Sequence, residues 1–138
     1  MGVLIDASIL IQAERGRLDL AAHVADRPDE EAFVSVITAS ELLHGVERAA
    51  DADQRARRAA FVEGVLAGFP LLALDVPAAR AHSRLWADLA SAGLLIGPHD
   101  LWLAATCIAH GLGMVTANVR EFERVPGLRL EIWSDVSF

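Results

Sequence analysis

The feature that most constrains the fold is a regular alternation of short apolar runs with longer helical patterns. Five short runs predict strands, at residues 3–5, 33–36, 71–75, 113–117 and 128–133. Between them lie six segments with helical periodicity, at residues 8–14, 18–26, 38–50, 54–68, 78–92 and 98–110. The first strands are continuously apolar, which is typical of parallel strands covered on both faces. The sequence therefore predicts an α/β fold with a parallel sheet flanked by helices.

The chain is long enough to form one domain with its own core. Its 138 residues contain no linker, internal repeat or low-complexity tract, so residues 1–138 are predicted to form a single domain. No apolar run approaches the roughly 18 to 20 residues that cross a bilayer, and the chain starts without the basic region of a signal peptide. Because Cys107 is the single cysteine, no internal disulfide can form. We therefore expect a cytoplasmic protein that does not bind membranes.

Polar side chains follow the predicted strands at the points where those strands end. Asp6 closes the first strand, and Glu41 lies in the helix after the second. Thr116 and Asn118 flank the end of the fourth strand, and Asp100 lies in the first turn of the helix before it. Ligands of open α/β sheets bind beyond the carboxyl ends of the strands. This edge of the sheet is therefore the predicted location of a functional site.

Each of these residues, taken alone, also has a purely structural explanation. Asp6 and Asn118 could cap the helices that follow them. Thr38 and Glu41 have the spacing of a capping box, in which the glutamate bonds back to the amide of the cap residue. Asp100 could complement the dipole of its helix. Only the joint placement of these residues favours a functional interpretation.

A cluster of three carboxylates at this edge would have a restricted chemistry. Two carboxylates about 4 Å apart repel by about 4 kcal/mol at an effective dielectric constant near 20, so they take up protons or bind a cation. Oxygen ligands alone suit Mg²⁺ or Mn²⁺. Such an ion lowers the pKa of a bound water and stabilises the charge that develops during attack on a phosphodiester. If Asp6, Glu41 and Asp100 converge, they therefore favour metal-dependent phosphodiester cleavage.

Four segments of the chain resemble a known family. In this order, "VLIDASILI", "SVITASELLHGV", "IGPHDLWLAATCIAHG" and "MVTANVREFERVPGLRLEIW" are similar to the PIN-domain ribonucleases, and specifically to the VapC toxins of type II toxin–antitoxin pairs. The resemblance implies a PIN-like domain with a central parallel sheet of about five strands. It also implies a Mg²⁺-dependent endoribonuclease that cuts RNA, forms a homodimer and is inhibited by a cognate antitoxin protein.

The resemblance also assigns roles to individual residues. Asp6, Glu41 and Asp100 match the three acids of the family and are the implied metal ligands. The implied catalytic set is Asp6, Glu41, Asp100 and Asn118, with Ser8 and Thr116 in support.

Two positions depart from the family pattern. Ala7 stands where the family commonly has Thr, so Ser8 is left to supply a hydroxyl. Asn118 stands where many members have Asp, and its neutral oxygen favours one bound ion over two. We expect Asn118 to act through a water or to position the substrate.

The charge of the chain limits how it can hold RNA. With twelve Arg, no Lys and a net charge of −7, its overall field does not attract phosphates. Local arginines must compensate, and the group Arg55, Arg57 and Arg58 fits either a phosphate grip or a solvated helix face equally well. His99, beside Asp100, is interpreted as a partly exposed residue at a helix start.

Two other functions compete with the ribonuclease interpretation. One is a PIN-like binding or regulatory module with weak catalysis, which Asn118 would fit but the three acids argue against. The other is a phospho-acceptor domain of the response-regulator type, which also gathers aspartates around Mg²⁺ at strand ends. That fold needs a lysine late in the chain, and this chain has none. No residue indicates which RNA would be cut.

Overall fold

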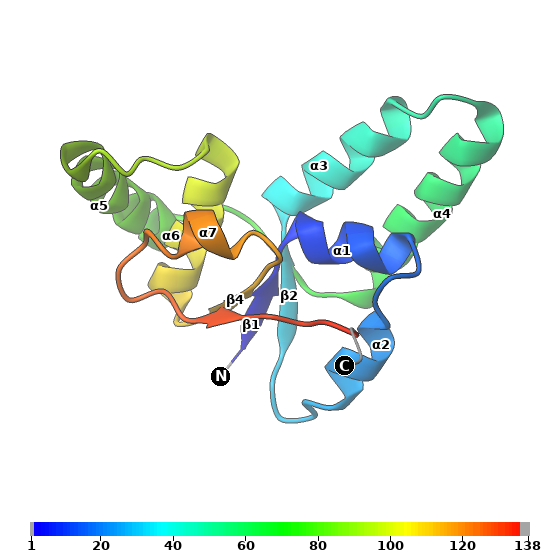
Figure 1. Ribbon diagram of the computed structural model, residues 1–138, viewed down its shortest axis with the longest axis horizontal. Helices are drawn as coiled ribbons and strands as arrows, with labels where there is room; N and C mark the ends of the chain where they lie inside the picture. Colours follow the sequence, from blue (N-terminus) through cyan, green and yellow to red (C-terminus); the bar gives the residue numbers. More distant parts are fainter. Residues whose placement is uncertain (1, 136–138) are drawn as a thin grey trace.

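Five short strands form one sheet in the computed structural model, which describes residues 2–135 (Figure 1). The strands are β1 (Val3–Ile5), β2 (Ala32–Ser35), β3 (Leu71–Leu72), β4 (Gly113–Val115) and β5 (Leu130–Glu131). All pairings are parallel, in the order β3-β2-β1-β4-β5. The predicted α/β class and the parallel five-stranded sheet are therefore confirmed.

Helices cover both faces of the sheet and spread from it as two arms (Figure 1). Within residues 2–135 they are α1 (Ala7–Glu14), α2 (Leu20–Ala25), α3 (Val36–Glu47), α4 (Ala52–Gly68), α5 (Val76–Ala92), α6 (Pro98–His110) and α7 (Val119–Phe122). In the part of the chain that is described, none of these helices has the length and apolar character needed to cross a membrane.

Side chains at alternate strand positions enter two separate cores. Leu4 and Met114 pack with helices α5, α6 and α7. Val3, Ile5 and Val115 pack with helices α1, α3 and α4. Successive strand residues point to opposite faces, so one strand supplies both cores. This is why β1, buried on both faces, is apolar throughout.

The strand order puts β1 at the centre, and the direction of winding reverses beside it. From β1 the chain winds outward through β2 to β3, then returns to the other side of β1 to form β4 and β5. The sequence did not show which edge of the sheet Asp100 approaches. The order settles this, because α6 leads directly into β4 beside β1. The carboxyl ends of β1, β2 and β4 thus meet at a switch point, the usual place for a ligand in such sheets.

The predicted capping box at the start of α3 is wrong. Val36 was predicted to end the second strand, but α3 begins at that residue. Ser35 is the N-cap, and its Oγ accepts a hydrogen bond from the backbone N of Ile37 at 3.0 Å. A serine at the strand end is a strong cap and starts the helix earlier than Thr38 would. Thr38 therefore lies inside the helix, fully buried, and Glu41 is not needed as a capping group.

The outer strands are shorter than predicted, because helix and turn contacts take over their ends. Only Leu71–Leu72 pair with β2, and Asp75 instead caps α5 by accepting from the backbone N of Ala78 at 2.9 Å. The helix ends were predicted better. Gly93 and Gly111 terminate α5 and α6 in the left-handed conformation, at φ 71° and 66°.

Candidate active site

Asp6 is held at the carboxyl end of β1 by three hydrogen bonds. Its Oδ1 accepts from the backbone N of Ala7 at 2.8 Å and so caps α1. Its Oδ2 accepts from the hydroxyls of Ser8 and Thr116, each at 2.8 Å. The residue is 6% exposed, and hydrogen bonds to a buried carboxylate are strong. Asp6 is therefore fixed relative to the ends of both β1 and β4.

The same two hydroxyls organise the turn after β4. Ser8 Oγ accepts from the backbone N of Ala117 at 3.0 Å, and Thr116 Oγ1 accepts from the backbone N of Asn118 at 2.9 Å. Asn118 occupies the N-cap position of α7, but its side chain makes no capping bond. The backbone of this turn, and with it the position of Asn118, is therefore tied to Asp6.

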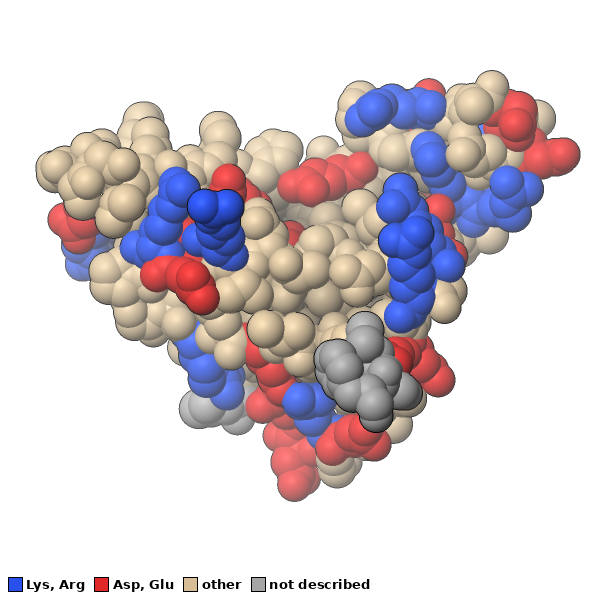
Figure 2. Space-filling view, viewed as in Figure 1, with Lys and Arg blue, Asp and Glu red and all other residues tan. Residues whose placement is uncertain are grey.

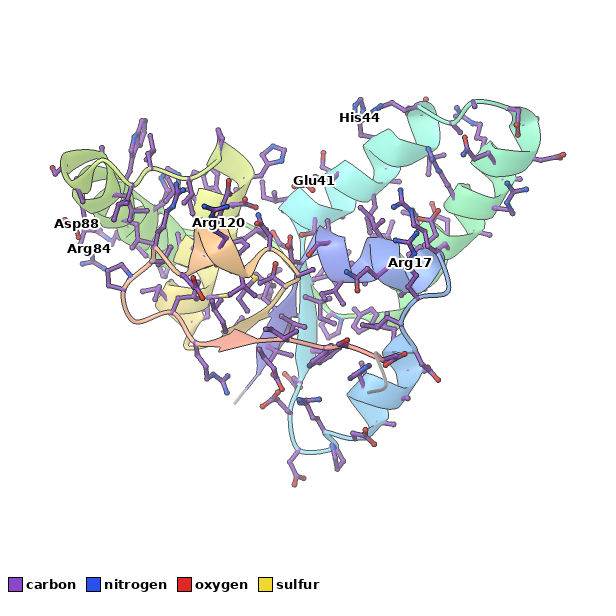
Figure 3. The ribbon with its side chains drawn as sticks, viewed as in Figure 1. Arg17, Glu41, His44, Arg84, Asp88 and Arg120 are labelled. Carbon is purple, nitrogen blue, oxygen red and sulfur yellow. The ribbon has the colours of Figure 1, made fainter. Side chains whose placement is uncertain are left out.

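Glu41 approaches from α3 and meets a histidine from α6. Its Oε1 lies 2.9 Å from Nδ1 of His99. The two side chains are 34% and 59% exposed, so the pair lies at the mouth of the site. Figure 3 shows Glu41 on α3, on the side of the space between the two arms. The interpretation of His99 as a helix-start residue is right about its exposure, but it missed this contact.

Asp100 lies half-buried in the first turn of α6 with a strongly raised pKa. Burial is the largest cause, and it acts together with a hydrogen bond to Glu121 to raise the pKa of Asp100 from 3.8 to about 7. The negative charges of Asp6, Glu121 and Glu41 act in the same direction and are included in this pKa of about 7. The structure thus brings the three predicted acids within electrostatic reach of one another.

Glu121 is a fourth acid at this site, and the sequence analysis missed it. It lies in α7, three residues after Asn118, and shares a hydrogen bond with Asp100. Two carboxyl groups can share such a bond only when one of them holds a proton, and this is why the bond raises the pKa of Asp100. Its place in the segment "TANVREF" was the available signal, since that segment also carries Asn118.

The chemistry of these donors fits a hard divalent cation. The four acids offer carboxylate oxygens, and among residues 2–135 no arginine forms an ion pair with any of them. Figure 2 shows acidic side chains deep in the hollow between the arms, with arginines on the ridges to either side. A cation would relieve the repulsion that raises the pKa of Asp100.

Within the described residues, however, no three His, Cys, Asp or Glu side chains converge on one metal position. Shared ligation therefore requires the side chains to draw together.

Comparisons with known proteins agree with this geometry. The PIN domain family matches residues 3–128. Ribonuclease VapC1 of Rickettsia felis is 36% identical over 132 residues, which cover 94% of this chain and 95% of that protein. The tRNA(fMet)-specific endonuclease VapC of Salmonella typhimurium is 39% identical over 100 residues, covering 72% of this chain and 74% of that protein.

A solved structure gives the same result in three dimensions. VapBC-5 from Mycobacterium tuberculosis, a member of the VapBC family of toxin-antitoxin systems, superposes with a TM-score of 0.76 at 34% identity. The superposition covers 96% of this chain and 98% of that one. With the family match, the two relatives and the shared fold taken together, the chain belongs to the PIN-domain family and, within it, to the VapC ribonucleases.

Proposed function

We infer that the protein is an endoribonuclease, the toxin of a toxin–antitoxin pair whose antitoxin inhibits it. The relatives from Rickettsia felis and Salmonella typhimurium are named as a ribonuclease and a tRNA-specific endonuclease, and VapBC-5 belongs to a toxin-antitoxin family. The observation that carries the inference is the gathering of Asp6, Glu41 and Asp100 at the sheet edge where β1, β2 and β4 end, which also raises the pKa of Asp100. An RNA substrate is consistent with action in the cytoplasm.

The three acids Asp6, Asp100 and Glu41 are the proposed ligands of Mg²⁺, or of Mn²⁺ in its place. Asp6 and Asp100 would bind directly, and Glu41 directly or through a water. When bound, a divalent cation stabilises negative charge on the phosphate and lowers the pKa of a coordinated water. The oxygen-only donor set and the mutual repulsion of these acids support this assignment.

The surrounding residues prepare the site for that role. Ser8 and Thr116 fix the carboxylate of Asp6 through two hydrogen bonds of 2.8 Å, so its orientation is set before any ligand binds. Asn118 is positioned by the same network and supplies a neutral oxygen for a water or for the RNA. Asp100 must release the proton that it shares with Glu121 before it can act as an anionic ligand.

Expression in cells with mapping of cleaved RNA ends tests this function. We expect the wild type to produce a defined set of new RNA ends and Asp100→Asn to produce none, because the change removes one ligand charge and keeps the side-chain shape. Asp88→Asn is the matched control, since Asp88 is an exposed residue of α5 away from the site (Figure 3). A set of ends shared by wild type and Asp100→Asn, or no new ends in either, would overturn the proposal.

A further inference from the structure

A pocket of about 460 Å³ opens directly beside the acidic site, between α1, α3 and α4. Glu41 belongs to its lining, so the pocket and the site share a side chain. Its other charged lining residues are Glu14, Arg15, Arg48 and Arg58, with His44 beside them. We call this feature the arginine pocket.

The three arginines are the distinctive chemistry of the arginine pocket. Arg15 and Arg48 are exposed, and among the described residues their guanidinium groups have no ion-pair partner. Arg58 is partly buried, and its Nη1 donates to the backbone O of Gly45 at 2.8 Å. Its Nε lies 4.0 Å from Glu14. Arg58 is thus held in place by hydrogen bonding, while Arg15 and Arg48 carry positive charges that no ion pair neutralises in the described part of the chain.

The structure also shows that Arg55, Arg57 and Arg58, for which the sequence allowed either a phosphate grip or a solvated helix face, have different surroundings. Arg55 forms an ion pair with Glu47 at 3.1 Å on the surface of α4. Arg57 is exposed and does not line the pocket. Arg58 alone of the three lines the arginine pocket, so neither of the two interpretations of the group holds for all its members.

We propose that the arginine pocket binds backbone phosphate of the RNA strand as it enters the acidic site; this rests on the proposed function. A chain of net charge −7 with four acids at its site repels phosphates, so affinity must come from local cations. Guanidinium groups present paired donors that match phosphate oxygens. Because Glu41 lines both the pocket and the site, a strand held by Arg15 and Arg48 lies next to the proposed metal ligands.

An acidic segment of a partner protein is the competing occupant. RNA is favoured because the pocket shares Glu41 with the site where a phosphodiester would be cut. A protein segment gains most of its affinity from buried apolar contacts, and the residues with apolar side chains that line the pocket are Ile11 and Leu42. Leu42 is already buried in the core beneath.

Binding of labelled bulk tRNA, measured over a range of salt concentrations, tests the proposal. Cleavage is removed by working in an Asp100→Asn background, and Arg15→Ala/Arg48→Ala is compared with its parent. Each phosphate contact to a single strand contributes about 0.7 to the slope of log affinity against log salt. We expect the double variant to bind tRNA roughly tenfold more weakly and to lower that slope by about 1.4.

The matched control is Arg57→Ala/Arg84→Ala, which removes the same charge from exposed positions on α4 and α5 outside the pocket. We expect this control to bind tRNA like its parent, and both double variants to keep the parent's thermal unfolding midpoint. Equal tRNA affinity and equal salt slope in the two double variants would overturn the proposal. So would a pocket variant that keeps tRNA affinity and loses only inhibition by co-expressed antitoxin, which would assign the pocket to the partner protein.

Failure here is separable from failure of the proposed function. If the wild type cuts RNA but the pocket variant binds tRNA like the control, only the arginine pocket is wrong. If the wild type cuts no RNA at all, the ribonuclease function is wrong, whatever the arginine variants do.

Discussion

Asp100 has an unusual titration, and it links stability to function at one residue. Its pKa is about 7 in the folded chain and about 3.8 when unfolded, chiefly because of burial. At pH values between these two pKa values, the folded state binds more protons than the unfolded state. The free energy of unfolding therefore falls as pH rises through this range. In the metal-free protein the charged form of Asp100 therefore opposes folding at neutral pH.

Asp100→Asn should consequently stabilise the metal-free protein, and more so at high pH. After a discount of about half for solvent screening, the gain in the free energy of unfolding should be about 1 kcal/mol larger at pH 8 than at pH 5. Urea unfolding in EDTA at both pH values measures it. A gain that is the same at both pH values would show that Asp100 has an ordinary pKa.

After burial, the hydrogen bond from Glu121 is the next cause that holds the pKa of Asp100 high. Glu121→Gln removes the carboxylate with which Asp100 shares its proton, together with one negative charge, so it should lower the pKa of Asp100 and shift the pH profile of Mg²⁺-dependent cleavage toward acid. Glu123→Gln, an exposed neighbour, is the control and should leave the profile unchanged. An unshifted profile in the Glu121 variant would show that the two carboxyl groups do not interact during catalysis.

At the scale of elements, the site depends on how β1 and β4 are joined. The buried hydroxyl of Thr116 donates to Asp6 and accepts from the backbone N of Asn118, so it connects the first strand to the turn after the fourth. Thr116→Val keeps the shape, removes one of the two hydroxyl bonds to Asp6 Oδ2, and leaves the backbone N of Asn118 without its Thr116 partner. It should reduce the free energy of unfolding by about 1–3 kcal/mol and also reduce cleavage.

Thr106→Val separates these two effects. Thr106 is equally buried, but its hydroxyl donates only to the backbone O of Trp102 within α6. This variant should cost less stability and leave cleavage at the wild-type rate once protein amounts are matched. Equal activity in the Thr116 and Thr106 variants would contradict the positioning role of Thr116.

The elements could be predicted from the sequence where local signals agree with tertiary contacts. The buried strand β1 and the glycine ends of α5 and α6 carry unambiguous patterns. The start of α3 was misjudged because Ser35 and Thr38 are both capable caps, and only the point where the chain leaves the sheet decides between them.

Within the site, too, some features follow from local sequence signals and others depend on tertiary contacts. Asp6, Asp100 and Asn118 could be selected because each lies next to a strand end or a helix start. Glu41 was selected on the same ground, but it lies in the middle of α3 because the helix begins earlier than expected. The bond between His99 and Glu41 joins residues 58 positions apart, and that between Glu121 and Asp100 joins α7 to α6. Neither follows from spacing, because both depend on the order in which the strands assemble.

At the scale of the whole molecule, the predicted homodimer is still to be tested. The surface of α5 and the loop after it exposes large apolar side chains, including Trp86 at 54%, Leu94 and Leu95. If they form the dimer contact, sedimentation should give a dimer for the wild type and a monomer for Trp86→Glu, with Trp86→Phe still dimeric. A monomeric wild type at micromolar concentration would exclude a stable homodimer.

The most direct test of the central claim is cleavage of labelled tRNA by the purified protein as Mg²⁺ is titrated. If the carboxylates bind the metal, tRNA should not be cleaved in EDTA, and cleavage should saturate as Mg²⁺ is added. The cleavage rate should fall by at least about a hundredfold in Asp100→Asn and stay unchanged in Asp88→Asn. Cleavage that persists in EDTA, or that proceeds at the wild-type rate in Asp100→Asn, would contradict a metal-dependent ribonuclease site at this edge of the sheet.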